Sequence, residues 1–177
     1  MPQLAVAVLG PDRPGVVAAL TEVLLADGGN LEDASMTLLR GQFTMALVVD
    51  VPRSVGDVSA ALDRVAAQLD LLVSVRETSP DSDDLRPPAS PYVLRVHGAD
   101  RPGLLHRATA LFASYDANIT DLATRLVGEA GRGVYVMHVS VDVPTSAPVE
   151  GLVRAVSALA EELDVEATLR PADDDLL

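Results

Sequence analysis

The sequence predicts an α+β chain built from two copies of one βαββαβ module, each an antiparallel sheet with its helices on one face. Three observations lead to this prediction. The motif Asp-Arg-Pro-Gly occurs twice, at residues 12–15 and 100–103. Valine-rich runs alternate with Ala- and Leu-rich runs in the same order around each motif. A segment rich in Pro, Ser and Asp separates the two copies.

In the first copy, a short apolar strand leads into a helix whose apolar residues recur at helical spacing. Pro14 is expected at the first position of this helix, because its fixed φ and missing N–H cost nothing there. Gly28 and Gly29 are expected to end the helix, and Gly41 to form a hairpin turn. The expected elements are the strand Leu4–Leu9, the helix from Pro14, the strands Leu31–Leu39 and Phe43–Val51, the helix Val55–Leu69 and the strand Leu71–Arg76.

The second copy repeats this order. From Val8 to Asp33, nine of 26 residues are identical to those 88 positions later. The offset then becomes 92, which places four extra residues in the Gly128–Gly133 turn. Two such modules correspond to the ferredoxin-like plan. The expected elements are Tyr92–His97, Pro102–Tyr115, Ile119–Val127, Val134–Val143, Pro148–Leu163 and Val165–Leu169.

The repeat and the composition together predict the domain organisation. We expect a first domain at 1–78, a linker at 79–90, a second domain at 91–170 and an acidic tail at 171–177. A small sheet leaves its edges and its helix-free face needing cover. The two copies could cover each other by edge pairing or face packing, and a homodimer is compatible with the same need.

The composition excludes several classes of function. The formal net charge is −13, and all 13 basic residues are arginine. Such a chain should repel nucleic acid and anionic membranes. The absence of cysteine rules out disulfides, thiolate catalysis and cysteine-based metal sites. No apolar run reaches the ~20 residues of a membrane span, and the N-terminus lacks signal-peptide features, so a cytoplasmic location is expected.

The two Asp-Arg-Pro-Gly turns are the first candidate binding elements. A helix N-terminus offers unpaired N–H groups and partial positive charge, which suit a carboxylate. The turn glycine would let a ligand approach the backbone, and the turn aspartate could accept a hydrogen bond from an ammonium group. The competing interpretation is turn and capping chemistry without a ligand. The candidate residues are Asp12, Pro14 and Gly15, with Asp100, Pro102 and Gly103.

Asn30 and Asn118 are the second candidate element. They are the only asparagines of the chain and occupy equivalent positions, after the first helix and before the second strand of each copy. An amide donates and accepts hydrogen bonds, so it can recognise an α-carboxylate or α-amino group. The competing interpretation is that asparagine supplies the left-handed residue that ends a helix.

No catalytic residues, metal site or cofactor are expected, and the chain is predicted not to be an enzyme. The three histidines lack metal-ligand spacing, and no nucleophile is linked by motif to a base. His97 and His106 flank the second turn and could contact a ligand there. Leu9 and Ala18 stand at the matching positions of the first copy, so the two turns differ chemically.

The succession of strand, Asp-Arg-Pro-Gly turn, helix, asparagine and strand resembles the ACT domain, over almost the whole length of both copies. The resemblance implies an amino-acid site at the interface between two modules, lined by the turn and by the asparagine. Some members that bind amino acids carry a histidine where Gly10 and Gly98 stand here, and that polar contact is missing. A free-standing pair of modules is similar to the glycine cleavage system transcriptional repressor group, whose members are thought to act through a protein partner.

The expected function is therefore that of an allosteric regulatory protein that senses a small molecule, with an amino acid as the expected ligand. It would act through a protein partner, without direct contact to nucleic acid or membranes. The alternative is a ligand-independent interaction module whose pockets are vestigial. A small enzyme is the weakest hypothesis, because no nucleophile, base or metal set is clustered or repeated.

Overall fold

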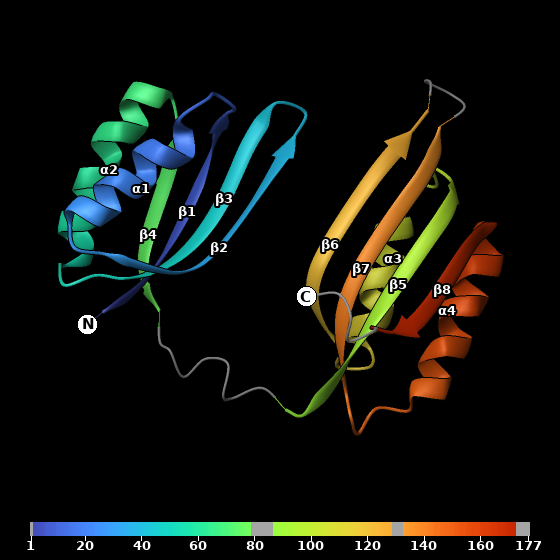
Figure 1. Ribbon diagram of the computed structural model, residues 1–177. Coiled ribbons are helices and arrows are strands. Elements are labelled where there is room, and N and C mark those ends of the chain that lie inside the picture. The colour runs from blue at the N-terminus through green and yellow to red at the C-terminus, as the bar shows by residue number, and fades with distance from the viewer. Residues whose placement is uncertain (1, 79–86, 129–132, 173–177) are drawn as a thin grey trace. The chain divides into compact units, whose positions relative to one another are not determined.

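The computed structural model describes residues 2–78, 87–128 and 133–172. The chain divides into two compact units, Met1–Arg86 and Pro87–Leu177 (Figure 1). Each unit has its own sheet and its own hydrophobic core. The extra residues of the Gly128–Gly133 turn, most of the predicted linker at 79–90 and most of the predicted tail at 171–177 lie outside the described residues.

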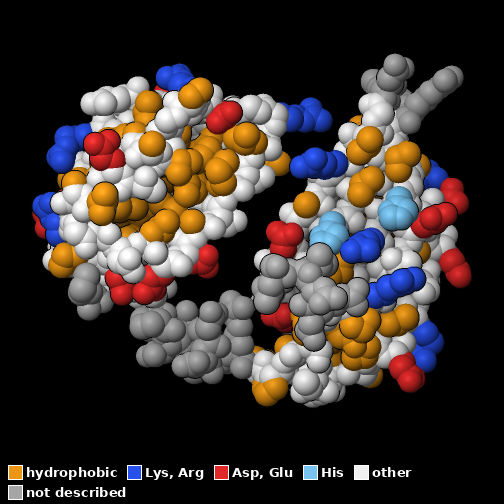
Figure 2. All heavy atoms as spheres, in the orientation of Figure 1, with side chains coloured by type: hydrophobic (Ala, Val, Ile, Leu, Met, Phe, Trp, Pro, Cys, Tyr) orange, Lys and Arg blue, Asp and Glu red, His pale blue; other side chains and the backbone are white. Residues whose placement is uncertain are grey.

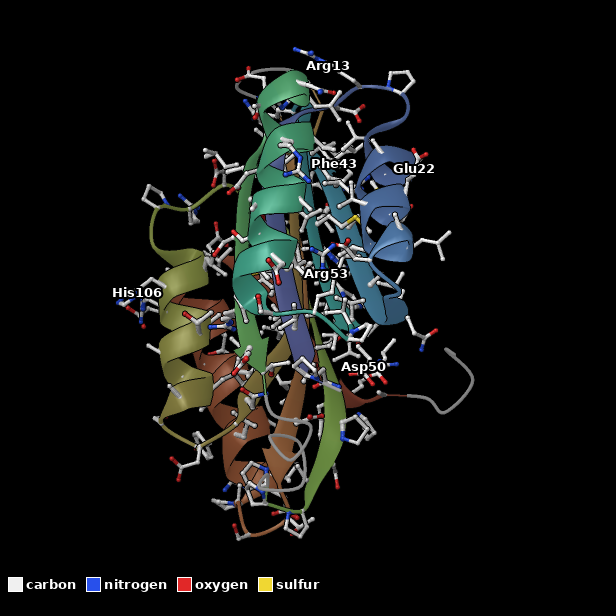
Figure 3. All side chains as sticks on the ribbon, turned by 90° about the vertical axis from the view of Figure 1, so that its left-hand side faces the viewer. Arg13, Glu22, Phe43, Asp50, Arg53 and His106 are labelled. Carbon is white, nitrogen blue, oxygen red and sulfur yellow. The ribbon has the colours of Figure 1, made fainter. Side chains whose placement is uncertain are left out.

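Unit 1 is a four-stranded antiparallel sheet in the order β2-β3-β1-β4, with two helices packed on one face (Figures 1 and 3). β1 lies in the middle and pairs with β3 on one side and β4 on the other. The elements are β1 Gln3–Pro11, α1 Val16–Ala26, β2 Asn30–Leu39, β3 Gln42–Asp50, α2 Val55–Leu69 and β4 Leu72–Thr78.

Unit 2 repeats this arrangement with the strand order β6-β7-β5-β8. Its elements are β5 Ala89–Ala99, α3 Leu104–Ala113, β6 Asn118–Val127, β7 Val134–Pro144, α4 Val149–Leu163 and β8 Val165–Pro171. The predicted fold class, two ferredoxin-like βαββαβ modules with helices on one face, is confirmed.

The core of each unit lies between the sheet and its two helices. In the central strands alternate residues are buried, as in a sheet with one covered face. Leu4, Val6 and Val8 of β1 face Leu20 and Leu24 of α1 within one cluster. In unit 2 the equivalent cluster is built around Leu94, Phe112, Met137 and Leu152. The core is almost wholly aliphatic, as the scarcity of aromatic residues requires.

Three element boundaries differ from the sequence predictions in an informative way. α1 begins at Val16 and α3 at Leu104, so Pro14 and Pro102 are not the first helical residues. The expectation for Pro14 was wrong because this proline lies in a tight turn that precedes the helix. β5 also begins earlier than expected, at Ala89, because its first residues pair with the end of β7.

The outer strand of each sheet leaves hydrophobic side chains uncovered. In β2 all ten residues are exposed. Leu31, Met36 and Leu38 lie opposite core residues of β3, on the helix side of the sheet, yet are 44%, 49% and 51% exposed. Leu122 and Leu126 of β6 are similarly exposed. Each unit therefore presents a hydrophobic row at one edge that its own helices do not cover.

Candidate ligand-binding site

The Arg-Pro-Gly part of each motif forms a type II β-turn. In unit 1 the backbone N–H of Val16 donates to the carbonyl of Arg13 at 3.3 Å, and Gly15 has φ 92° and ψ −5°. In unit 2 Leu104 donates to Arg101 at 3.1 Å, and Gly103 has φ 84° and ψ −3°. A type II turn favours proline at its second position and requires positive φ at its third. The turn alone therefore explains the proline and the glycine.

The aspartate of each motif is not explained by local structure. Gly15 and Gly103 are the N-caps of α1 and α3, and neither helix has a side-chain cap. The interpretation of the aspartates as helix caps was therefore wrong. Both Asp12 and Asp100 are exposed, so their carboxylates are free to meet a ligand from solvent.

The helix N-termini beside these aspartates retain unpaired donors. The first bond into α1 runs from the N–H of Ala19 to the carbonyl of Gly15, at 2.9 Å, and α3 begins in the same way. In the described part of unit 1, the N–H groups of Val17 and Ala18 have no backbone acceptor. Such donors, together with the helix dipole, favour a carboxylate.

Close packing explains Gly10 and Gly98, which stand where some ACT domains carry a histidine. A Cβ atom on Gly10 would lie 2.6 Å from Leu71 Cδ2 and 2.8 Å from the carbonyl oxygen of Asp70. A Cβ on Gly98 would lie 2.7 Å from Val165 Cγ1. In both units the residues that follow the second helix pack directly on the end of the first strand. Any side chain at these positions would therefore force the backbone apart.

Asn30 and Asn118 are the first residues of β2 and β6, and both are exposed. Neither has a positive φ. The left-handed residue lies two positions earlier in each unit, at Gly28 (φ 76°) and Asp116 (φ 55°). The interpretation of the asparagines as helix-ending residues was therefore wrong, and the structure gives their amides no such local role.

The backbone around each asparagine is fixed in the same way in both units. A β-bulge interrupts the outer strand just after it, between Leu31 and Asp33 and between Ile119 and Asp121. Bulges are frequent beside functional sites because they redirect side chains. In unit 1 the end of α1 is also held by an ion pair between Asp27 and Arg53; Arg53 is labelled in Figure 3.

Within one unit, the turn and the asparagine lie at opposite ends of the sheet. The backbone N–H of Asp12 bonds the carbonyl of Gly41, at the β2–β3 hairpin. Asn30 instead pairs with Asp50 at the other end of that hairpin. Arg13 and Asp50 mark these two ends in Figure 3. The ten residues of β2 span about 30 Å at ~3.3 Å per residue. A single module therefore cannot bring its turn and its asparagine to one small ligand.

A groove lies beside Asn30, between the exposed side of α1 and the start of β2. Its lining includes Ala18, Thr21, Leu25 and Asn30. The sequence did not reveal it, because it depends on how the helix crosses the outer strand. The position of Ala18 is taken by His106 in unit 2, on the exposed surface of α3 (Figure 3). His106 therefore corresponds to a residue that lines the groove of unit 1.

His97 does not accompany His106. It lies on β5 opposite Val136 and Glu166, whose side chains point to the helix-free face of the sheet. The two histidines that flank the turn in sequence therefore lie on opposite faces of unit 2. His97 is on the helix-free face of the sheet, and His106 is in the helix layer. Among the described residues, no three His, Asp or Glu side chains gather as metal ligands, and no described helix is long and apolar enough to cross a membrane.

Two ion pairs anchor the helix layer of unit 2 near its turn. Arg101 of the turn bonds Asp164 at the end of α4, with 3.1 Å between Nη2 and Oδ2. Arg107 of α3 makes a two-pronged contact with Glu162 of α4. The hydrogen bonds from Arg107 lower the pKa of the Glu162 carboxyl from its ordinary value and raise that of Arg107.

Comparison with known proteins decides the family. Two ACT-domain models match this chain in succession, one over residues 3–76 and one over residues 92–161. The chain belongs to the ACT-domain family. Each match spans most of one structural unit, so both units are ACT modules and the recognition of the tandem arrangement is confirmed.

Several known proteins align with nearly the whole chain. The glycine cleavage system transcriptional repressor of Escherichia coli is 29% identical over 170 residues, which cover 94% of this chain and 88% of the repressor. A solved structure of an unknown protein from Galdieria sulphuraria is 28% identical, with a TM-score of 0.83, and covers 97% of this chain and 99% of that one. A second structure, provisionally described as a glycine cleavage system transcriptional repressor, superposes with a TM-score of 0.71 at 22% identity, covering 98% of each chain.

Proposed function

We propose that this protein is a regulatory sensor of a small molecule, with an amino acid as its ligand. One observation carries the proposal. Each ACT module holds its turn and its asparagine at opposite ends of one sheet. Helix capping does not explain the turn aspartate, and a left-handed backbone does not explain the asparagine. A ligand that contacts both must therefore sit between two modules. The membership of the ACT family and the likeness to a transcriptional repressor support the same function.

The chemistry of the two halves suits an amino acid. The unpaired N–H groups at the start of α1 would receive the α-carboxylate, while Asp12 would accept a bond from the α-ammonium group. Asn30 or Asn118 of the neighbouring module would add a donor and an acceptor from the other side. The ligand-binding residues proposed are Asp12, Pro14, Gly15 and Asn30, with Asp100, Pro102, Gly103 and Asn118.

Binding between modules supplies a route to regulation. Each module exposes a hydrophobic row on its outer strand, at Leu31, Met36 and Leu38 in unit 1, and a second module would cover it. A ligand that joins two modules stabilises the arrangement in which they are packed. Its presence therefore shifts the population between states that a protein partner can distinguish. Action without DNA contact fits the net charge of −13. The proposed location is the cytoplasm.

Calorimetric and thermal-shift titration of the full chain with the protein amino acids tests the proposal. We expect at least one amino acid to raise the unfolding midpoint. Asn30→Ala and Asn118→Ala should weaken that response, whereas Gln68→Ala, which removes an exposed amide from α2, should not. No response to any amino acid, or an equal response in all three variants, would contradict the proposal.

The type II turn favours the alternative function. Because Pro14 and Gly15 are explained by the turn itself, their repetition does not require a ligand. A ligand-independent interaction module would bind its protein partner equally with and without amino acids. Capture of the partner by the immobilised full chain, with and without each amino acid, separates the two functions.

A further inference from the structure

We propose that the helix-free face of the sheet in unit 2 is a docking surface for an acidic segment of a partner protein. This inference rests on the proposed function, because it specifies the chemistry of the partner through which the sensor acts. It starts from three arginines that share this face: Arg125 on β6, Arg95 on β5 and Arg170 on β8.

Strand register places these arginines on one diagonal across the sheet. Arg125 lies opposite Val136, which lies opposite His97. Arg95 is two residues before His97 on β5. Arg170 of β8 lies opposite Val93, which is two residues before Arg95. With strands ~4.8 Å apart and ~3.4 Å per residue, the diagonal spans roughly 20 Å. We call Arg125, Arg95 and Arg170, with His138 beside Arg95, the arginine diagonal.

No acidic residue lies directly opposite an arginine of the diagonal. Arg95 has His138 and Thr168 as its cross-strand partners, while Arg125 and Arg170 each have a valine. In the described residues none of the three makes an ion pair. By contrast, the arginines of the helix and turn layer of unit 2 are each paired with a carboxylate: Arg101 with Asp164, Arg107 with Glu162 and Arg154 with Glu150. The carboxylates of the helix-free face, Asp121, Asp142 and Glu166, lie off the diagonal.

Unit 1 matches only one arginine of the diagonal, because Arg76, opposite Ala5, corresponds to Arg170, opposite Val93. At the positions of Arg95 and His138, the sheet of unit 1 has Ala7 and Ala46, which line a shallow hollow between small side chains. The two ACT modules therefore share a backbone but differ on this face. Figure 2 shows histidine and arginine side chains gathered over the strands of unit 2.

The spacing of the three arginines favours a short acidic polypeptide. An extended segment of about six residues spans ~20 Å, so its carboxylates could meet all three guanidinium groups. A small anion would reach only one or two of them. Nucleic acid carries a far denser run of anions, about one charge per 1.7 Å of duplex, so the net charge of −13 opposes it more strongly than a short segment with a few carboxylates. The arginine diagonal thus fits a short acidic stretch on a protein.

A labelled hexaglutamate peptide, binding to the full chain at low ionic strength, tests the inference. We expect saturable binding that added salt weakens, and no binding of hexaglutamine. Replacing Arg95, Arg125 and Arg170 together by Gln should weaken binding roughly tenfold or more, as expected when charge-assisted hydrogen bonds are lost. The control replaces Arg40, Arg64 and Arg154 by Gln, removes the same charge elsewhere, and should change affinity less than about twofold.

Three outcomes would overturn the inference: no binding by the parent, equal losses in both triple variants, or equally tight binding of a single-stranded oligonucleotide of the same charge. Replacement of the same three arginines by Lys keeps the charge and should retain most of the affinity, which guards against a folding artefact. Amino-acid titration of the same proteins is read separately. An amino-acid response without peptide binding would contradict only this inference. Peptide binding without any amino-acid response would contradict the proposed sensor function.

Discussion

Nη2 of Arg101 lies 3.1 Å from Oδ2 of Asp164, and this contact ties the turn of unit 2 to the end of α4. The equivalent residues of unit 1, Arg13 and Asp70, make no such ion pair within the described residues. Since both side chains of the pair are exposed, at 44% and 89%, the contact is worth only about 0–1 kcal/mol. It therefore adds little to the stability of the fold, and we expect its effect to be a local restraint on the turn.

Replacing Arg101 by Ala should loosen the second turn while leaving the unfolding midpoint nearly unchanged. We expect faster hydrogen exchange at the backbone amides of Leu104 and Leu105, because the turn preceding them loses its link to α4. Arg13→Ala should leave exchange at Val16 and Val17 unchanged. Acceleration in both variants, or in neither, would show that the ion pair does not restrain the turn.

Gly10→Ala and Gly98→Ala should each destabilise the protein. The added methyl group would overlap the end of α2 or the start of β8, and overpacking of this kind costs about 1–3 kcal/mol. Gly56→Ala is the control: its Cβ would meet only Ser54 Oγ at 3.9 Å, and alanine favours a helix interior by about 0.5–1 kcal/mol. Chemical denaturation measures all three. Unchanged stability of the first two would mean that the packing is adjustable.

Gly15→Ala should destabilise unit 1 by about 1–2 kcal/mol, because an alanine with φ near 92° is strained. The space around the new methyl group is open, so the cost comes from the backbone alone. Gly15→Asn should recover part of the loss, since asparagine tolerates left-handed geometry better. Equal losses in the two variants would indicate a steric cause instead.

Met36→Lys should weaken the packing of the outer edge of unit 1 against another module. Met36 is apolar and 49% exposed on the helix side of β2, so covering it contributes to module association. Sedimentation of the full chain and its amino-acid response measure the effect. Thr37→Lys, on the opposite face of the same strand, should change both properties less. A full response in Met36→Lys would exclude this edge from the ligand-dependent interface.

The pair Arg107–Glu162 should stabilise unit 2 in a pH-dependent way. Because Arg107 lowers the pKa of Glu162 below its ordinary value of 4.5, the folded state binds that proton less readily than the unfolded state. The contribution is thus present above this value and is lost as the pH falls through the lower folded pKa. Glu162→Gln should be slightly less stable than the parent near neutral pH and indistinguishable from it in strong acid. A difference that persists in acid would point to packing.

Much of the fold could be predicted because its signals are local. The helix Val55–Leu69 has the bounds expected from its apolar stripe. The start of α1 could not be placed from Pro14 alone, since proline suits both a first helical position and the second position of a type II turn. The glycine that follows, at positive φ, decides between them.

The candidate site was harder to predict, because it depends on how distant segments are arranged. The motif residues Asp12 and Asn30 could be selected from the repeat, but their separation emerges only from the pairing of β2 with β3. His97 and His106 are close in sequence, yet a strand and a helix direct them to opposite faces. The arginine diagonal requires the register of four strands at once, and no short sequence pattern contains it.

The bulge that follows Asn30 and Asn118 has a consequence for solubility. A straight, ten-residue outer strand with exposed hydrophobic side chains is a template for uncontrolled edge-to-edge polymerisation into fibrils. The extra residue, Glu32 in unit 1 and Thr120 in unit 2, interrupts the regular spacing of backbone donors and acceptors and increases the local twist. Only a partner strand with a compatible irregularity can then pair along the whole edge. The bulge that follows each asparagine therefore also limits unspecific aggregation.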